Sequence, residues 1–150
     1  MYIQQFYYLY LMEEYPNIQA VNPMTCISSK IRKCNRIVAN VFRQYLNPMG
    51  ITDSQLSVLF ITTKGQMINQ ARLSQMLYLD KSTVNRNIER LVQNGYIAFD
   101  DQKYLFTTSK GKDFLEKIIP QWDKAMEEIR EILDDEGELA LNVLFKKLTA

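Results

Sequence analysis

The residues best suited to contact another molecule lie in one short stretch, residues 81–94. Val84, Ile88 and Leu91 recur there at spacings of four and three, which places them on one inward face of a helix. Side chains of the types on the other faces hydrogen-bond base edges and phosphates in a DNA major groove. Taken alone, the segment fits the solvated face of an ordinary helix at least as well. The flanking segments therefore decide between DNA binding and an ordinary surface helix. The candidate DNA-binding side chains are Lys81, Ser82, Thr83, Asn85, Arg86 and Arg90.

A second short helix is expected just before this one. Asn69 is a suitable N-cap, and three apolar side chains would face inward: Leu73, Met76 and Leu77. Residues 78–80 form the turn, and Asp80 can cap the second helix. Asn94-Gly95 is a strong C-terminal stop.

Two strands are predicted after Gly95. Residues 96–99 and 104–107 have strand composition, and residues 100–103 form the tip between them, with Lys103 as its cation. Met67 and Ile68 are candidates for a short strand that pairs with this wing. Two helices, a tight turn and a two-stranded wing are the layout of a winged helix-turn-helix.

Longer helices are expected on both sides of this lobe. A helix from Thr25 to Leu46 has an apolar stripe that begins at Ile27, Ile31 and Cys34 and continues through Val38, Val41 and Tyr45. Residues 52–55 form a capping box before a helix that buries Leu56, Leu59 and Phe60. A long helix begins at Thr108 or Ser109; Pro120 should bend or split it, and residues 134–137 interrupt it before a last amphipathic helix.

The predicted fold class is mainly α with a small β-wing, in one domain over residues 1–150. Residues 50–107 form the DNA-binding lobe, and residues 1–46 and 108–150 are the expected dimerisation helices. Residues 2–13 are Tyr-rich and apolar on most sides, so they need a partner surface, within the subunit or in a second copy.

The charge is segregated along the chain. Residues 26–112 contain 13 Lys and Arg against 5 Asp and Glu, whereas residues 113–150 contain 5 against 10. A basic middle region fits a phosphate-facing lobe. The chain has no run of about 18 apolar residues, so no transmembrane helix is predicted. The first residues do not have the pattern of a secretory signal. Two cysteines without a disulfide pattern favour a cytoplasmic location.

Catalytic chemistry has little support. The chain has no histidine, and no phosphate loop, nucleophile elbow or zinc-type cysteine cluster is present, so we expect neither an enzyme nor a cofactor. The acidic run at residues 134–138 fits a solvated interhelical turn better than a metal site. Cys34 is expected to be a buried structural residue. Cys26, near a helix N-terminus, is the candidate redox sensor, although a structural role is the alternative we favour.

The motifs together resemble the MarR family, the multiple-antibiotic-resistance-type regulators. The matching segments are residues 50–59 (GITDSQLSVL), 73–77 (LSQML), 79–86 (LDKSTVNR), 90–97 (RLVQNGYI) and 106–112 (FTTSKGK). The resemblance implies a homodimer whose terminal helices form the interface and whose two recognition helices address a pseudo-palindromic double-stranded operator. It also implies a small anionic or phenolic effector bound between the dimer helices and the DNA-binding lobe. The acidic wing tip, with Asp100 and Asp101, departs from the basic wing of the family.

The sequence therefore predicts a dimeric, sequence-specific transcriptional regulator, for which repression and activation both remain open. A winged-helix module that binds protein through its acidic wing, without specific DNA binding, is the alternative. A small thiol enzyme using Cys26 is a third possibility, and the absence of histidine counts against it.

Overall fold

The computed structural model describes residues 15–150, so the Tyr-rich segment lies outside the described residues. The chain divides into two units, Met1–Ile37 and Val38–Ala150. In the first unit, α2 (Pro16–Ala20) and the short 3-10 helix η1 (Pro23–Thr25) precede the start of α3 (Ile27–Leu46). Asn22 caps η1 by accepting a hydrogen bond from the Met24 amide at 2.9 Å.

The apolar stripe of α3 is buried only in its last turns. Val41, Phe42 and Leu46 belong to the core, and Val38 and Tyr45 pack against it. The expected burial of Cys34 is wrong, because Cys34 is exposed. Ile27 and Ile31 of the same stripe are exposed too, and no other described segment covers them. An apolar stripe predicts that a face will be covered, but it does not say by which chain.

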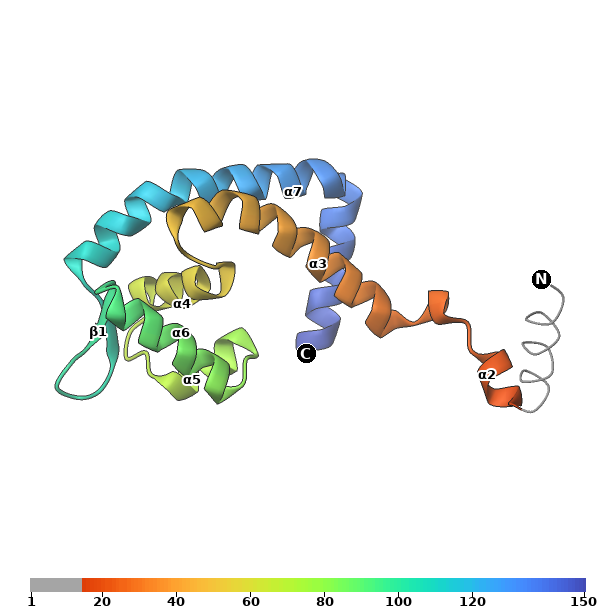
Figure 1. Cartoon of the computed structure of the whole chain (residues 1–150), viewed down its shortest axis with the longest axis horizontal. Coiled ribbons are helices and arrows are strands. Elements are labelled where there is room, and N and C mark those ends of the chain that lie inside the picture. Colours follow the sequence, from red (N-terminus) through yellow and green to blue (C-terminus); the bar gives the residue numbers. More distant parts are fainter. Residues whose placement is uncertain (1–14) are drawn as a thin grey trace, which may run out of the picture. The chain divides into compact units, whose positions relative to one another are not determined.

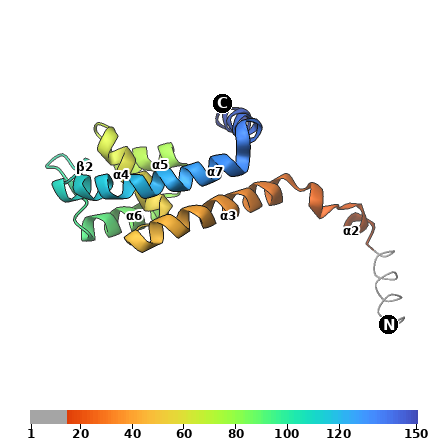
Figure 2. The same ribbon diagram turned by 90° about the horizontal axis from the view of Figure 1, so that it is seen from above.

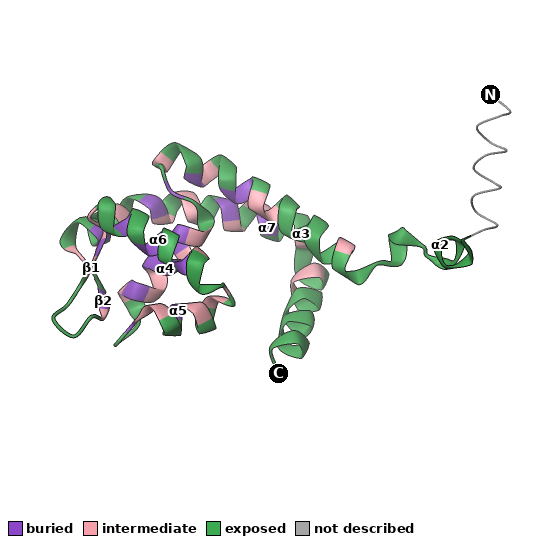
Figure 3. Cartoon of the chain, turned by 60° about the horizontal axis from the view of Figure 1, so that its bottom comes forward, coloured by how far each residue is buried: buried purple, intermediate pink, exposed green. Residues whose placement is uncertain are grey.

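The core of the second unit lies between α3, α4 and α7 and the helix-turn-helix. The 3-10 helix η2 (Asn47–Met49) ends at Gly50 in the left-handed region, and α4 (Asp53–Lys64) follows. The predicted capping box is present: Thr52 Oγ1 accepts from the Gln55 amide, and Gln55 Oε1 accepts from the Thr52 amide. Figure 3 shows buried residues along α4, whose Leu56 and Leu59 are fully enclosed.

The helix-turn-helix is formed by α5 (Gln70–Leu77) and α6 (Lys81–Gln93). Asn69 caps α5 as predicted, by accepting a hydrogen bond from the Arg72 amide at 2.9 Å. Leu73 is buried and Leu77 is half-buried, but Met76 is 49% exposed, so its expected inward position is wrong. Because α5 is only eight residues long, the face that packs on the lobe is narrow, and it includes Leu73 and Leu77 but not Met76.

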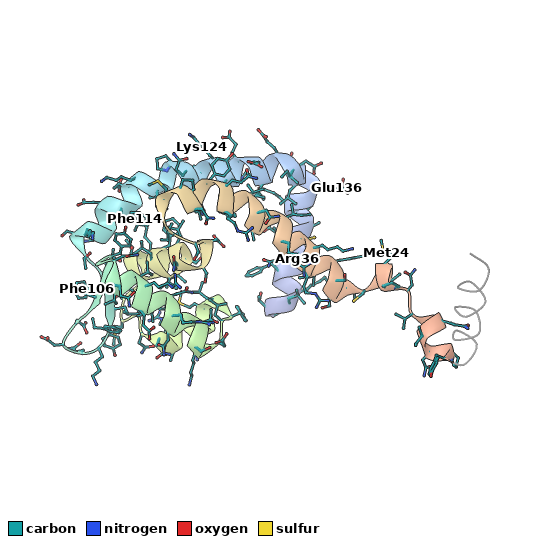
Figure 4. The ribbon with its side chains drawn as sticks, viewed as in Figure 1. Met24, Arg36, Phe106, Phe114, Lys124 and Glu136 are labelled. Atoms are coloured by element: carbon teal, nitrogen blue, oxygen red, sulfur yellow. The ribbon has the colours of Figure 1, made fainter. Side chains whose placement is uncertain are left out.

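The wing consists of β1 (Ile97–Phe99) and β2 (Leu105–Thr107), paired antiparallel with Ala98 opposite Phe106. The predicted strand at Met67 and Ile68 is reduced to one isolated bridge, Ile68 to Leu105. Figures 1 and 4 show the wing at the start of α7, where Phe114 lies beside it. Phe114 stacks on Tyr96 with ring centroids 4.3 Å apart.

The last element, α7 (Ser109–Thr149), begins at Thr108, whose side chain accepts from the Gly111 amide. The helix runs on through Pro120, so the possible split there does not occur. The break lies at Asp134, with φ 53° and ψ −174°, inside the predicted acidic turn. Figure 2 shows the last turns of α3 beside α7, where the Tyr45 hydroxyl donates to Glu128 at 2.7 Å. Among the described residues, no helix is long and apolar enough to span a bilayer.

Candidate nucleic-acid interface

One face of α6 is fixed to the lobe. Val84, Ile88 and Leu91 are buried as predicted. Asn87, which is also buried, donates from Nδ2 to Ser54 Oγ on α4 at 2.7 Å. The neighbouring helix is tied to the start of α6, because Gln70 Nε2 donates to the Lys81 carbonyl at 3.2 Å. These contacts hold α6 in a single orientation.

The other side of α6 is open. Thr83 is half-buried, and the remaining predicted contact residues of the helix are exposed: Lys81, Ser82, Asn85, Arg86 and Arg90. Three of them are cations, and Glu89 is the acid that lies between Arg86 and Arg90. The arrangement presents short polar groups in the first turn of α6 and guanidinium groups farther along it. These are the group types that contact bases and phosphates in a major groove.

The first turn of α6 contains a hydrogen-bond network that the sequence did not reveal. The Asp80 carboxylate caps the helix by accepting from the Thr83 amide at 2.8 Å. It also accepts from the Ser82 and Thr83 hydroxyls, at 2.5 and 2.7 Å. Thr83 Oγ1 in turn accepts from Arg86 Nη2 at 3.1 Å. The hydrogen bond from Ser82, followed by those from Thr83, holds the pKa of Asp80 well below its usual range.

A polar groove of about 630 Å³ runs between the outer side of α6 and the α3–α4 connection. Arg86 and Arg90 both line it, so the structure brings these two predicted residues together. Helical periodicity identified the α6 side, but it could not identify the opposite wall, because that wall is formed by residues distant in sequence. The other lining residues are Asn47, Gly50, Ile51, Thr52, Gln55, Glu89, Gln93 and Asn94.

Lys103 does not line that groove and lies at the exposed tip of the wing, with φ 65°. The tip is a tight turn in which Asp100 Oδ1 accepts from the amides of Gln102 and Tyr104, at 3.0 and 2.7 Å. Asp100 therefore has a structural role in the turn, whereas Asp101 is exposed. Two carboxylates beside one ammonium keep the tip acidic.

Cys26 is exposed and directly precedes α3. Cys34 lies eight residues after Cys26. The seven helical steps from Ile27 to Cys34 alone span about 10 Å at 1.5 Å per residue. A disulfide requires Cα atoms within about 7 Å, so this helix does not allow an intramolecular bond between the two.

Residues 49–103, which contain the helix-turn-helix and the first strand and tip of the wing, match the model of the MarR family. The uncharacterized HTH-type transcriptional regulator YwoH of Bacillus subtilis (strain 168) is 29% identical over 123 residues, which cover 78% of this chain and 89% of YwoH. The chain thus shares most of its length with a helix-turn-helix regulator.

Two solved structures share the fold. One is BpsR of Bordetella bronchiseptica, whose DNA binding is described as regulated by 6-hydroxynicotinic acid; the TM-score is 0.77 at 18% identity, over 86% of this chain and 97% of that one. The other is the Mycobacterium tuberculosis regulator MosR in complex with DNA. Its TM-score is 0.68 at 21% identity, over 83% of this chain and 98% of that one. The family match, the YwoH relationship and the common winged-helix fold show that this chain is similar to the MarR family of transcriptional regulators.

Proposed function

We propose that the chain is a dimeric, sequence-specific repressor that places α6 in the major groove of a pseudo-palindromic operator. The observation that supports this most strongly is the open face of α6. Five of its predicted contact residues are exposed, while the opposite face is buried and hydrogen-bonded to α4, and the start of the helix is hydrogen-bonded to α5. A helix held rigidly on one side and left polar on the other is suited to groove recognition.

A second copy of the chain is the partner that best fits the exposed apolar side chains. The last part of α7 exposes large apolar residues, and Figure 3 shows this part of the helix as almost wholly exposed. In the first unit, Ile27, Ile31 and Ile37 on α3 are also exposed. Exposed apolar side chains on each of these segments indicate an interface. The residues on α7 are Leu139, Leu141, Val143, Leu144, Phe145 and Leu148.

The groove beside α6 suits a small anionic effector. Its volume of about 630 Å³ is within the range of small-molecule sites, and its lining includes two guanidinium groups. A carboxylate bound between Arg86 and Arg90 would occupy the cations that contact the operator, so effector and operator would compete. The regulation of BpsR by 6-hydroxynicotinic acid supports an aromatic acid as the effector class.

The effector proposal is tested with 6-hydroxynicotinate as the probe. We expect it to displace DNA from the parent and to do so at several-fold higher concentration from Arg90→Gln, which keeps a polar side chain but removes the charge. Equal displacement curves for parent and variant would contradict the groove as the effector site. Lys103→Gln is the matched control, because it removes a charge outside the groove.

The DNA proposal is tested by enrichment of duplexes from a random-sequence library with the full-length chain, at low and at high salt. We expect one shared motif with two related half-sites, separated by about one helical turn. Enrichment that depends on salt but gives no motif would mean non-specific binding.

Protein binding through the wing is the alternative function. It is favoured by the acidic tip and by Phe99 and Phe106, which are 52% and 45% exposed. Figure 4 shows Phe106 on the wing. Failure of any duplex to bind at low salt would give this alternative the better support.

A further inference from the structure

Asp80 fixes the direction of two hydroxyl groups at the start of α6. Its Oδ1 accepts from Ser82 Oγ and from the Thr83 amide, and its Oδ2 accepts from Thr83 Oγ1. The carboxyl group remains ionised because these hydrogen bonds lower its pKa, and an ionised carboxylate can only accept. Each hydroxyl has one proton, so both protons point toward Asp80.

The hydroxyl oxygens therefore offer only lone pairs to an incoming molecule. Thr83 Oγ1 already accepts from Arg86 Nη2 and is half-buried. Ser82 is exposed, and no described donor contacts its oxygen, so it is the available acceptor of this turn. Phosphate oxygens are acceptors too, so neither hydroxyl can donate to a phosphate while it donates to Asp80.

The major groove contains only two kinds of hydrogen-bond donor. These are the exocyclic amino groups of cytosine and adenine, whereas guanine and thymine present acceptors at the corresponding positions. We propose that Ser82 Oγ accepts a hydrogen bond from the amino group of a cytosine or adenine, and that Asp80 is the positioning residue that imposes this preference. The inference rests on the proposed insertion of α6 into the major groove and specifies one of its base contacts.

The first test uses the highest-affinity duplex enriched by the full-length chain. Each cytosine or adenine is replaced singly by its N4-methyl or N6-methyl form, which keeps base pairing but removes the amino hydrogen that faces the major groove. At one position in each half-site, the parent should lose about three- to tenfold in affinity, the value of one neutral hydrogen bond. Ser82→Ala should bind the methylated and unmethylated duplexes equally at that position. If Ser82→Ala keeps every methylation effect of the parent, Ser82 does not contact an amino group.

The second test compares Asp80→Asn with Asp80→Ser. Both residues are good N-caps, and both remove the same charge, so helix stability and phosphate repulsion change alike. The asparagine Oδ1 can still accept from the Thr83 amide and from Ser82, so Asp80→Asn should keep the methylation effect. The shorter serine leaves the Ser82 proton free to rotate, and Asp80→Ser should lose about three- to tenfold of discrimination at the same position.

The outcomes separate this inference from the proposed function. Failure to enrich any motif would contradict sequence-specific binding and this inference together. A motif with unchanged discrimination in both Asp80 variants would contradict only the positioning role of Asp80. Thermal unfolding and the affinity for a scrambled duplex, measured for every variant, show that the loss is specific to one base contact.

Discussion

At the scale of single residues, α6 combines a helix face that periodicity predicts with a network that it does not. Val84, Ile88 and Leu91 were predictable because burial follows the 3.6-residue period. The direction in which the Ser82 and Thr83 hydroxyls donate could not be predicted, because it depends on side-chain rotamers that bring both hydroxyls to Asp80. Asp80 was expected only as a cap, and that part of its role is confirmed.

The two cations away from the first turn should contribute to DNA binding less than Arg86 does. Arg90 lies one turn farther along α6, and Lys103 lies on the acidic wing. Arg90→Ala and Lys103→Ala should each weaken binding to the selected and the scrambled duplex alike, by less than about 1 kcal/mol. If a phosphate contact is lost, the slope of log affinity against log salt concentration should fall by about 1. Isotherms at several salt concentrations measure both quantities. A sequence-dependent loss in Lys103→Ala would instead place the wing on base edges.

Base preference should not change with pH in the working range. The folded-state pKa of Asp80 is lowered, so the carboxylate network is complete above the ordinary Asp value and is lost only as pH falls through the lower folded value. The affinity ratio between the parent duplex and the duplex methylated at the Ser82 position should be the same at about pH 5.5 and pH 8. A ratio that collapses toward pH 5.5 would show that Asp80 becomes protonated in the complex.

At the scale of elements, local sequence signals predicted where the helices begin. Tertiary packing determined which predicted apolar faces are buried and whether a helix continues through a proline. Thr52, Asn69, Asp80 and Thr108 all cap helices, because a cap depends only on a few adjacent residues. Pro120 does not split α7, since Pro removes one intrahelical hydrogen bond and packing of the flanking turns can offset that loss. The groove beside α6 could be identified only from the three-dimensional fold, because its two walls come from segments distant in sequence.

The acidic wing tip should oppose DNA binding. Asp100→Asn combined with Asp101→Asn should tighten binding to selected and scrambled duplexes by a similar factor, because like-charge repulsion of phosphate is independent of sequence. Asparagine at position 100 can still accept from the Gln102 and Tyr104 amides, so the turn is preserved. Binding isotherms at low salt test this. Unchanged affinity would mean that the tip stays away from the DNA.

Gly111 should be intolerant of a side chain, although it lies within a helix. An added Cβ would lie 2.1 Å from the Tyr96 carbonyl oxygen, and backbone cannot move aside as a flexible side chain can. Gly111→Ala should therefore lower the free energy of unfolding by about 1–3 kcal/mol, against the gain of up to about 1 kcal/mol expected from helix propensity. Denaturant unfolding measures the difference, with the exposed Lys112→Ala as control. A more stable Gly111→Ala would show that α7 can shift away from the wing.

At the scale of the whole molecule, the apolar end of α7 should be covered by a second subunit. We expect a homodimer of twice 17.6 kDa, with more than about 2,000 Å² of total buried surface. Leu144→Glu would bury a charge in that interface and should weaken association on the order of hundredfold. Lys146→Glu, on the opposite side of this helix segment, is the control. Sedimentation of the parent as a monomer at micromolar concentration would contradict the dimer.

The central claim is that α6 contacts bases as well as phosphates, and Arg86 tests it most directly. Its guanidinium is exposed, lies next to the first turn and lines the groove beside α6. Binding of the parent and of Arg86→Ala is measured on one selected and one scrambled duplex, at two salt concentrations. We expect Arg86→Ala to lose about 1–3 kcal/mol of binding free energy on the selected duplex and much less on the scrambled one. If Arg86→Ala binds both duplexes as the parent does, α6 is not the recognition helix.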